Sequence, residues 1–197
     1  MLRSLLFGIA LAAAIPAQAA EVAGVNYPAQ VTVAGRPLVL NGAGIRYRFV
    51  VKVYTAGLYL PAKAETAEQA LAMPGAKRIH IQMLREIDSN TLGKLFTRGM
   101  EDNSSRAEFG KAIPGTLKLA ELFVAKKKLA PGEHFTVEYV PDRGTMILVN
   151  GQPGLTEWIK EPEFFTSMLK IWLGPKPADE LLKSALLGQD PQSNSGN

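Results

Sequence analysis

Residues 41–60 read NGAGIRYRFVVKVYTAGLYL. The segment opens with a glycine-rich turn at Asn41–Gly44 and continues as a long run of residues that favour β-strands. Side chains alternate faces along a strand, so the odd positions form a mostly apolar face. The even positions form a polar face made of Arg46, Arg48, Val50, Lys52 and Tyr54. We predict one long strand here.

Two interpretations of this strand remain open. An ordinary antiparallel strand with one face in water has the same alternation. The other possibility is that the basic face lines a cleft. Arg46 and Tyr54 would then present hydrogen-bond donors to a carbonyl, a phenolate or a carboxylate.

The N-terminus has the features of a secretory signal peptide. Arg3 precedes an apolar run over residues 5–15, and Ala17-Gln18-Ala19 fits the small-x-small cleavage pattern. We predict a signal peptide over residues 1–19, cleavage after Ala19 or Ala20, and an exported, periplasmic protein. The run is shorter than the about 20 residues of a transmembrane helix, and the mature chain contains no other candidate. An uncleaved N-terminal anchor is the alternative.

Composition excludes several kinds of chemistry. The 197 residues include no cysteine and two histidines, so we expect no disulfide and no zinc or copper site. The formal net charge of +4 is mild and implies no nucleic-acid partner. The chain contains no P-loop, no G-x-S-x-G elbow and no H-E-x-x-H motif. We therefore expect neither a metal nor a cofactor.

Hydrophobic periodicity predicts the remaining elements. Further strands are expected over 31–33, 38–40, 77–84, 134–140, 145–150 and 155–159, and helices over 66–73, 89–103, 106–128, 162–173 and 177–187. We expect the helix over 106–128 to bend or break at Pro114, and Asn103 to cap the helix over 89–103. We expect His80 to face solvent. Short connections between strands indicate a mainly antiparallel sheet. The predicted fold class is α+β: one domain over residues 20–188, with a curved sheet covered by a layer of helices, followed by a disordered tail, 189–197.

Several motifs resemble the chalcone isomerase fold family. Gly42-Ala43-Gly44-x-Arg46 resembles the family's GAGxR, and the segment KVYTAGLYL at residues 52–60 resembles its KFTxIGVYL. The helix ending in Asn103 and the segment 164–174 are also similar to plant enzymes. The resemblance spans about residues 25–187, and the signal peptide points to the exported bacterial branch of chalcone isomerase-like proteins. It implies an open-faced β-sandwich with a ligand cleft between sheet and helices.

The resemblance carries over to five positions. Arg46 matches the catalytic arginine, and Asn103 matches an asparagine of the cleft. Tyr54 stands where the plant enzymes have a threonine that orders a water, and Phe96 stands where they have a tyrosine. Phe165 stands where they have Ser or Thr. The segment after Arg46 is also shorter here, and three polar partners are changed.

These changes favour binding without catalysis. Two phenylalanines remove hydrogen bonds and add apolar area, which contributes about 25 cal/mol per Å² when buried. Arg46 could hold a carboxylate through charge-assisted hydrogen bonds. The family's fatty-acid-binding branch likewise pairs an arginine with a tyrosine. We expect Arg46 and Tyr54 to project from one strand into a cleft walled by Phe96, Asn103 and Phe165.

Three functions are therefore considered. The favoured one is a non-catalytic periplasmic protein that binds a fatty acid or similar amphiphilic carboxylate. One alternative is an isomerase, an intramolecular lyase that acts on a chalcone-like enone with Arg46 as its electrophilic group. The other is a protein-interaction module of the envelope without a small ligand. Arg48 and Lys52 are expected in the wetter parts of the strand.

Overall fold

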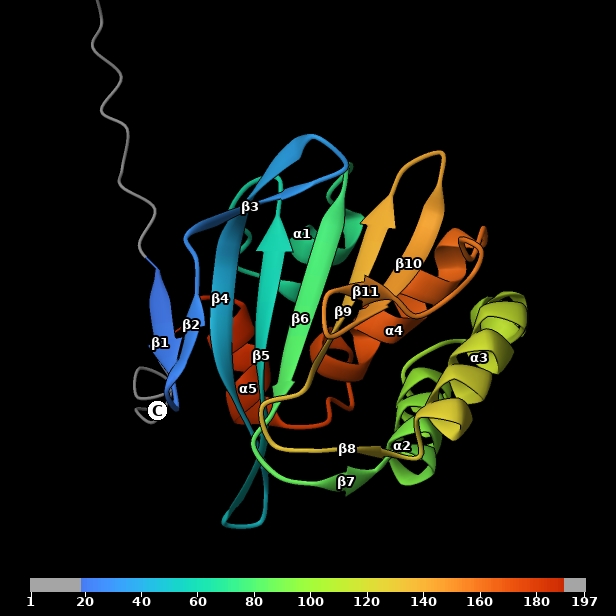
Figure 1. Cartoon of the computed structure of the whole chain (residues 1–197). Coiled ribbons are helices and arrows are strands. Elements are labelled where there is room, and N and C mark those ends of the chain that lie inside the picture. Colours follow the sequence, from blue (N-terminus) through green and yellow to red (C-terminus); the bar gives the residue numbers. More distant parts are fainter. Residues whose placement is uncertain (1–18, 190–197) are drawn as a thin grey trace, which may run out of the picture.

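A computed structural model describes residues 19–189 (Figure 1). Apart from Ala19 and Gln189, the predicted signal peptide and the predicted tail lie outside the described residues. Among the residues described, no helix is long and apolar enough to cross a bilayer.

A seven-stranded antiparallel sheet occupies the centre of the molecule, in the order β11-β10-β9-β6-β5-β4-β3 (Figure 1). Its strands are β3 (Gln30–Val33), β4 (Arg36–Arg48), β5 (Val51–Leu60), β6 (Lys77–Met83), β9 (His134–Val140), β10 (Gly144–Val149) and β11 (Gln152–Pro153). Two small ladders join β1 (Ala20–Val22) to β2 (Val25–Tyr27) and β7 (Ile87–Asp88) to β8 (Lys128–Leu129).

Five helices complete the described fold. They are α1 (Ala67–Ala72), α2 (Ser89–Asp102), α3 (Arg106–Lys126), α4 (Pro162–Leu173) and α5 (Glu180–Leu186). Helices α1, α4 and α5 lie behind the sheet in Figure 1, and α2 and α3 form a pair beside α4. The α+β prediction of a curved antiparallel sheet covered by helices is confirmed.

The predicted strand over residues 41–60 is wrong, because this segment contains a hairpin. β4 ends at Arg48, and Phe49 and Val50 form the turn into β5. Strand-favouring residues occupy the whole turn, so no Gly, Asn or Asp marks it. Phe49 instead adopts a positive φ of 56°.

Other local expectations hold or need adjustment. Asn150-Gly151 and Ala34-Gly35 form tight hairpin turns, with positive φ at both residues of each pair. The strand expected over 155–159 is replaced by β11 and by a single bridge between Thr145 and Ile159. α3 continues through Pro114 instead of breaking there.

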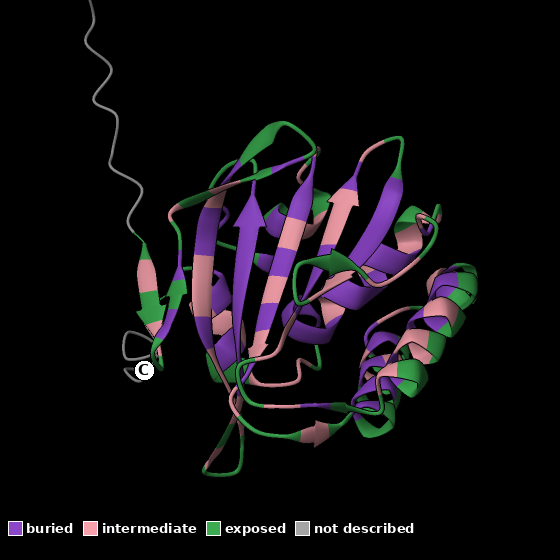
Figure 2. Cartoon of the chain, in the orientation of Figure 1, coloured by how far each residue is buried: buried purple, intermediate pink, exposed green. Residues whose placement is uncertain are grey.

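The main core lies between the sheet and α4. On this face, the fully buried Phe164, Met168 and Trp172 of α4 belong to one cluster with sheet residues of β5, β6, β9 and β10 (Figure 2). α4 is apolar over most of its surface because it also contacts α2 and α3. The helix thereby ties the sheet to the α2–α3 pair.

The base of the β4–β5 hairpin is packed closely on both faces. An added Cβ at Gly42 would lie 2.0 Å from the Ala185 carbonyl oxygen of α5, and one at Gly57 would lie 2.3 Å from the Tyr27 ring. Only glycine allows these approaches, so helix α5 and the Tyr27 ring can lie directly on the strands. The glycine-rich motif at residues 42–44 therefore serves helix packing.

Candidate ligand-binding cleft

A cleft of about 560 Å³ lies between the β4–β5 hairpin and helix α2. Its volume falls within the range of about 300–1,000 Å³ that is usual for small-molecule sites. The apolar lining consists of Phe49, Val51, Val53, Ile87, Leu92, Leu95, Phe96, Ile171, Pro177 and Ala178. A second hollow of about 480 Å³, between α2 and α3, is lined mostly by polar side chains. The first cleft is thus better suited to an apolar ligand.

Arg46 and Tyr54 are directly opposite each other in the β4–β5 ladder, and both line the cleft. The sequence prediction placed them on one strand, but the hairpin brings them together across two. Directly opposite side chains lie on the same face of an antiparallel pair, with Cβ atoms about 5 Å apart. The cross-strand pair thus places a guanidinium and a phenol side by side in the cleft.

Asp179 holds the Arg46 guanidinium from the other side. The Nη1 of Arg46 lies 3.7 Å from an Asp179 carboxylate oxygen. That carboxylate also accepts hydrogen bonds from the backbone N–H groups of Tyr47, Leu181 and Leu182. Because three backbone donors already satisfy Asp179, it orients Arg46 without consuming the hydrogen-bonding capacity of the guanidinium.

Trp172 fixes the position of the Tyr54 hydroxyl. The indole Nε1 donates to the Tyr54 oxygen at 2.9 Å, and both side chains are buried. An indole N–H only donates, so Tyr54 is the acceptor. Within residues 19–189, no acceptor is present for the Tyr54 hydroxyl proton, which can therefore be donated to a ligand.

Burial also keeps Tyr54 in its neutral form. Desolvation raises the pKa of Tyr54 from 10.0 to about 12, and the Trp172 hydrogen bond and the nearby Arg46 charge counteract only part of this rise. A neutral phenol beside a guanidinium supplies two kinds of donor and no negative charge. This combination suits an anionic oxygen.

Phe96 forms part of the inner wall. It is buried on α2, where its ring meets those of Phe123, Phe135 and Trp172 edge-on or tilted, with centroids 5.5–6.0 Å apart. Rings arranged this way pack favourably and resist displacement. Arg46, Tyr54 and Phe96 therefore line one cavity.

The structure does not bring Asn103 or Phe165 into this lining. Asn103 follows α2, and its side chain bonds the backbone of Gly99 and both backbone groups of Lys176. It thus acts as a helix cap and anchors the α4–α5 loop. Phe165 stacks on Tyr139 at the other end of α4, with ring centroids 5.3 Å apart. The residue of α4 that reaches the cleft is Ile171.

Charges around the cleft are unbalanced. Five cations and two carboxylates line it: Arg46, Arg48, Arg85, Arg98, Lys176, Glu86 and Asp102. Asp102 lies 3.5 Å from Arg98, itself one of the five cations, and Asp179 lies 3.7 Å from Arg46, whereas Glu86 lies 2.9 Å from Lys128 outside the lining. The excess is therefore carried by Arg48, Arg85 and Lys176. The positive excess favours an anionic ligand.

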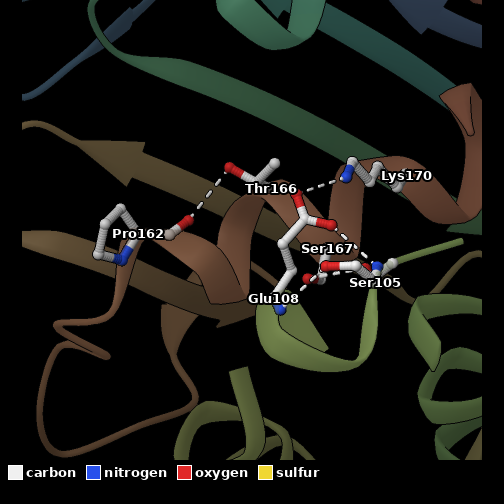
Figure 3. Close-up of polar contacts among 7 residues, drawn as sticks. Ser105, Glu108, Pro162, Thr166, Ser167 and Lys170 are labelled. Atoms are coloured by element: carbon white, nitrogen blue, oxygen red, sulfur yellow. Dashed lines mark hydrogen bonds and ion pairs between the residues drawn. The ribbon is translucent and has the colours of Figure 1, made fainter. Parts of the chain in front are cut away.

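A separate polar cluster joins α3 to α4 away from this cleft (Figure 3). Ser105 caps α3 reciprocally with Glu108, and Glu108 accepts from the Lys170 amine at 3.0 Å. The hydroxyl of Ser104 lies 3.0 Å from that of Ser167. The cluster is a structural connection between the helices.

Sequence reasoning missed Trp172 and Asp179 as parts of the site. The motif Pro177-Ala178-Asp179 before an apolar run signals a helix cap, and Asp179 does cap α5. Its contact with Arg46 joins residues far apart in the chain, which no local pattern indicates. Trp172 lies in the helix expected over 162–173, but its hydrogen bond to Tyr54 has no sequence signal.

Comparison with known proteins gives a family and a fold. A protein family described as chalcone isomerase-like matches residues 19–188. No curated protein matches the chain. A solved structure, the fatty-acid binding protein of Arabidopsis thaliana, superposes with a TM-score of 0.64 at 14% sequence identity, covering 83% of this chain and 92% of that one. At this identity the likeness shows a shared fold.

Proposed function

Because the chain belongs to the chalcone isomerase-like family, we propose that it binds a fatty acid or similar amphiphilic carboxylic acid without transforming it. The observation that carries the proposal is the cleft itself, in which the Arg46–Tyr54 pair stands at the edge of an apolar wall. The plant protein with the same fold is a fatty-acid binding protein, which supports this choice of ligand class.

The cleft suggests how such an acid would lie. Its carboxylate would accept charge-assisted hydrogen bonds from Arg46 and a hydrogen bond from the Tyr54 hydroxyl. Its chain would extend along β5 and α2, against Val53, Leu92 and Leu95. Each CH₂ group buried there contributes about 0.8 kcal/mol.

Binding alone is a better match than isomerisation. Cyclisation of a chalcone needs its phenolate form and stabilisation of a developing enolate. Phe96 cannot donate a hydrogen bond, and Asn103 is engaged with the α4–α5 loop. Arg46 and Tyr54 remain as donors, which is enough to hold an acid.

We also propose that the protein acts outside the cytoplasm. The signal-peptide pattern over residues 1–19 supports export to the periplasm. The N-terminus of the protein recovered from that compartment, determined by mass spectrometry, tests the cleavage after Ala19 or Ala20.

The direct test is to identify what the protein carries. The full chain is expressed and purified as the host processes it, and bound small molecules are extracted and identified by mass spectrometry. Palmitate is then added to the delipidated protein, and binding is measured by calorimetry and by the melting temperature. If no acid co-purifies and palmitate neither binds nor raises the melting temperature, the proposal fails. Hydroxychalcone turnover that disappears in Arg46→Ala would instead support the isomerase.

Tyr54→Phe isolates the contribution of the phenol. Loss of one neutral donor should weaken palmitate binding by about 1 kcal/mol. It also removes the acceptor of the buried Trp172 N–H, so the free energy of unfolding should fall by about 1–3 kcal/mol. Tyr139→Phe is the matched control, because it removes a hydroxyl outside the cleft and should change neither quantity measurably.

A further inference from the structure

The β4–β5 hairpin extends beyond the rest of the sheet (Figure 1). β6 pairs with β5 only from Tyr54 to Tyr59, and β3 pairs with β4 only from Arg36 to Val39. In the described part of the chain, residues 48–52 have no strand partner outside the hairpin. The hairpin end is thus an arm that projects from the domain.

The tip of this arm is apolar and exposed. Phe49 is 92% exposed and Val50 is 90% exposed, the highest values among the large exposed apolar side chains of the described residues. Phe49 also has a positive φ of 56°, a conformation that Asn and Gly adopt at much lower cost than an aromatic residue. A turn selected for stability would use those residues. A phenylalanine at this position therefore indicates a role for its side chain, such as contact with another surface.

Cations surround the apolar tip. Arg48 and Lys52 flank it on the two strands, and Arg85 stands on the loop that follows β6. All three are exposed, no carboxylate lies between Arg46 and Leu60, and Glu86 next to Arg85 is paired with Lys128 at 2.9 Å. An apolar tip flanked by cations is complementary to a bilayer with anionic headgroups, where the cations meet lipid phosphates and the tip enters the acyl boundary.

The tip also adjoins the mouth of the cleft. Arg48, Phe49 and Val51 belong both to the arm and to the cleft lining, and Arg85 of the loop after β6 lines the same cleft. A surface that contacts Phe49 therefore also lies against the cleft. An amphiphile could pass between bilayer and cleft without crossing bulk water.

We infer that the Arg48–Lys52 hairpin tip is a docking element for an anionic lipid bilayer, with Phe49 and Val50 as its inserted residues. This inference goes beyond the proposed function, because docking does not require an acid in the cleft. The partner is a lipid surface that contains phosphatidylglycerol or a similar anionic lipid.

The exposed side of α3 provides an internal comparison. Ile113, Leu117 and Val124 are exposed apolar residues there, spaced along one side of the helix. The helix does not line the cleft, and the cations next to Ile113 and Leu117 are paired, because Lys111 lies 3.0 Å from Glu163 and Lys118 lies 3.7 Å from Glu157. Val124 differs, since it precedes the run Lys126–Lys128. Apolar atoms can therefore be removed at Ile113 and Leu117, where the neighbouring cations are neutralised.

The test measures binding of the purified full-chain product, as the host processes it, to vesicles of phosphatidylcholine with or without phosphatidylglycerol. We expect binding to the mixed vesicles that weakens as salt is added, because charges contribute. Phe49→Asn should weaken it by about tenfold or more, since it removes the inserted ring and keeps a residue that tolerates the turn. The double control Ile113→Asn with Leu117→Asn should bind like the unaltered chain.

A second variant separates docking from the cleft. Val50 and Lys52 do not line the cavity, so Val50→Asp with Lys52→Glu should lose about tenfold or more in vesicle binding and keep palmitate binding in solution. The inference is overturned if the unaltered chain shows no preference for anionic vesicles, or if Phe49→Asn binds them equally well. It is also overturned if light scattering shows a dimer that Phe49→Asn dissociates, because the tip would then belong to a second copy.

Discussion

The two ends of the β4–β5 hairpin differ in almost every physical respect (Figure 2). At the base, Gly42 and Gly44 lie under α5, and the buried Asn41 side chain makes three hydrogen bonds to the backbone of Ala64 and Leu186. At the tip, Phe49 and Val50 are exposed, and among residues 19–189 no strand pairs with this end of the hairpin. The base of the hairpin is buried under other elements, and its tip is exposed at the protein surface.

The glycine motif of the hairpin and the candidate cleft are therefore different parts of it. The Gly-Ala-Gly segment is the most recognisable part of the hairpin, yet its glycines make room for a helix. Arg46 lies between the two ends, with its backbone in the ladder and its side chain in the cleft. The fold-defining glycines thus hold Arg46 in place without lining the cleft themselves.

The largest effect is expected at the base. Gly42→Ala would place a methyl group 2.0 Å from the Ala185 carbonyl oxygen, so α5 must move. We expect the free energy of unfolding to fall by about 3 kcal/mol, as measured by chemical denaturation. Gly110→Ala is the control, because its Cβ would meet nothing within 4 Å inside helix α3. That variant should gain up to about 1 kcal/mol, and equal losses in both would contradict close packing at the base.

The sequence predicted most of the fold because its signals there are local. Alternation, helix caps and turn pairs such as Asn150-Gly151 gave the class and most elements. The strand over residues 41–60 was wrong because its turn uses Phe49 and Val50, which favour strands. Where an exposed turn breaks the local rule, the sequence alone cannot show it, and such positions are often functional.

The next largest effect concerns the middle of the hairpin. Arg46→Ala should weaken palmitate binding by about 2–3 kcal/mol, since a charged hydrogen-bonding partner is lost. Asp179 keeps its three backbone donors, so the melting temperature should change little. Arg143→Ala, an exposed cation outside the cleft, is the control for net charge. Unchanged affinity in Arg46→Ala would place the carboxylate elsewhere.

The site was only partly predictable for a geometric reason. Arg46, Tyr54 and Phe96 line the cleft, whereas Phe165 lies at the other end of the same helix as Ile171. These two positions are six residues apart, about 9 Å along an α-helix. A residue-by-residue resemblance cannot correct an offset of this size, because the position along α4 depends on how the helix packs.

A smaller effect on the free energy of unfolding is expected from acid, through His80 of β6 beside the base of the hairpin. His80 pairs with Gly57 in the ladder, contacts the Tyr27 ring, and is only partly exposed, so the expectation that it faces solvent is wrong. Burial lowers the pKa of His80 from 6.5 to about 4, with smaller contributions from the Arg78 and His134 charges. Between these pH values the unfolded chain holds a proton on His80 that the folded protein lacks, so stability falls as pH falls.

Over this range we expect the folded state to lose about 1–2 kcal/mol through His80, after allowing for its partial exposure. His80→Gln keeps a side chain that can bond the Thr136 hydroxyl, 2.8 Å from Nδ1 in the unaltered protein. Denaturation curves of both proteins between pH 6.5 and 4 measure the difference. Parallel pH profiles would mean that His80 contributes nothing to acid sensitivity.

The smallest effect should have the opposite sign and occur at the tip. Phe49→Asn replaces an aromatic residue at positive φ with one that tolerates it, and no buried contact is lost because Phe49 is exposed. We expect the free energy of unfolding to rise by about 0.5–1 kcal/mol. Val50→Asn, at the neighbouring exposed position without a positive φ, should show no gain. If Phe49→Asn raises the free energy of unfolding and weakens vesicle binding, Phe49 lowers the stability of the turn and contributes to membrane contact. If the variant is less stable, the phenylalanine ring supports the turn.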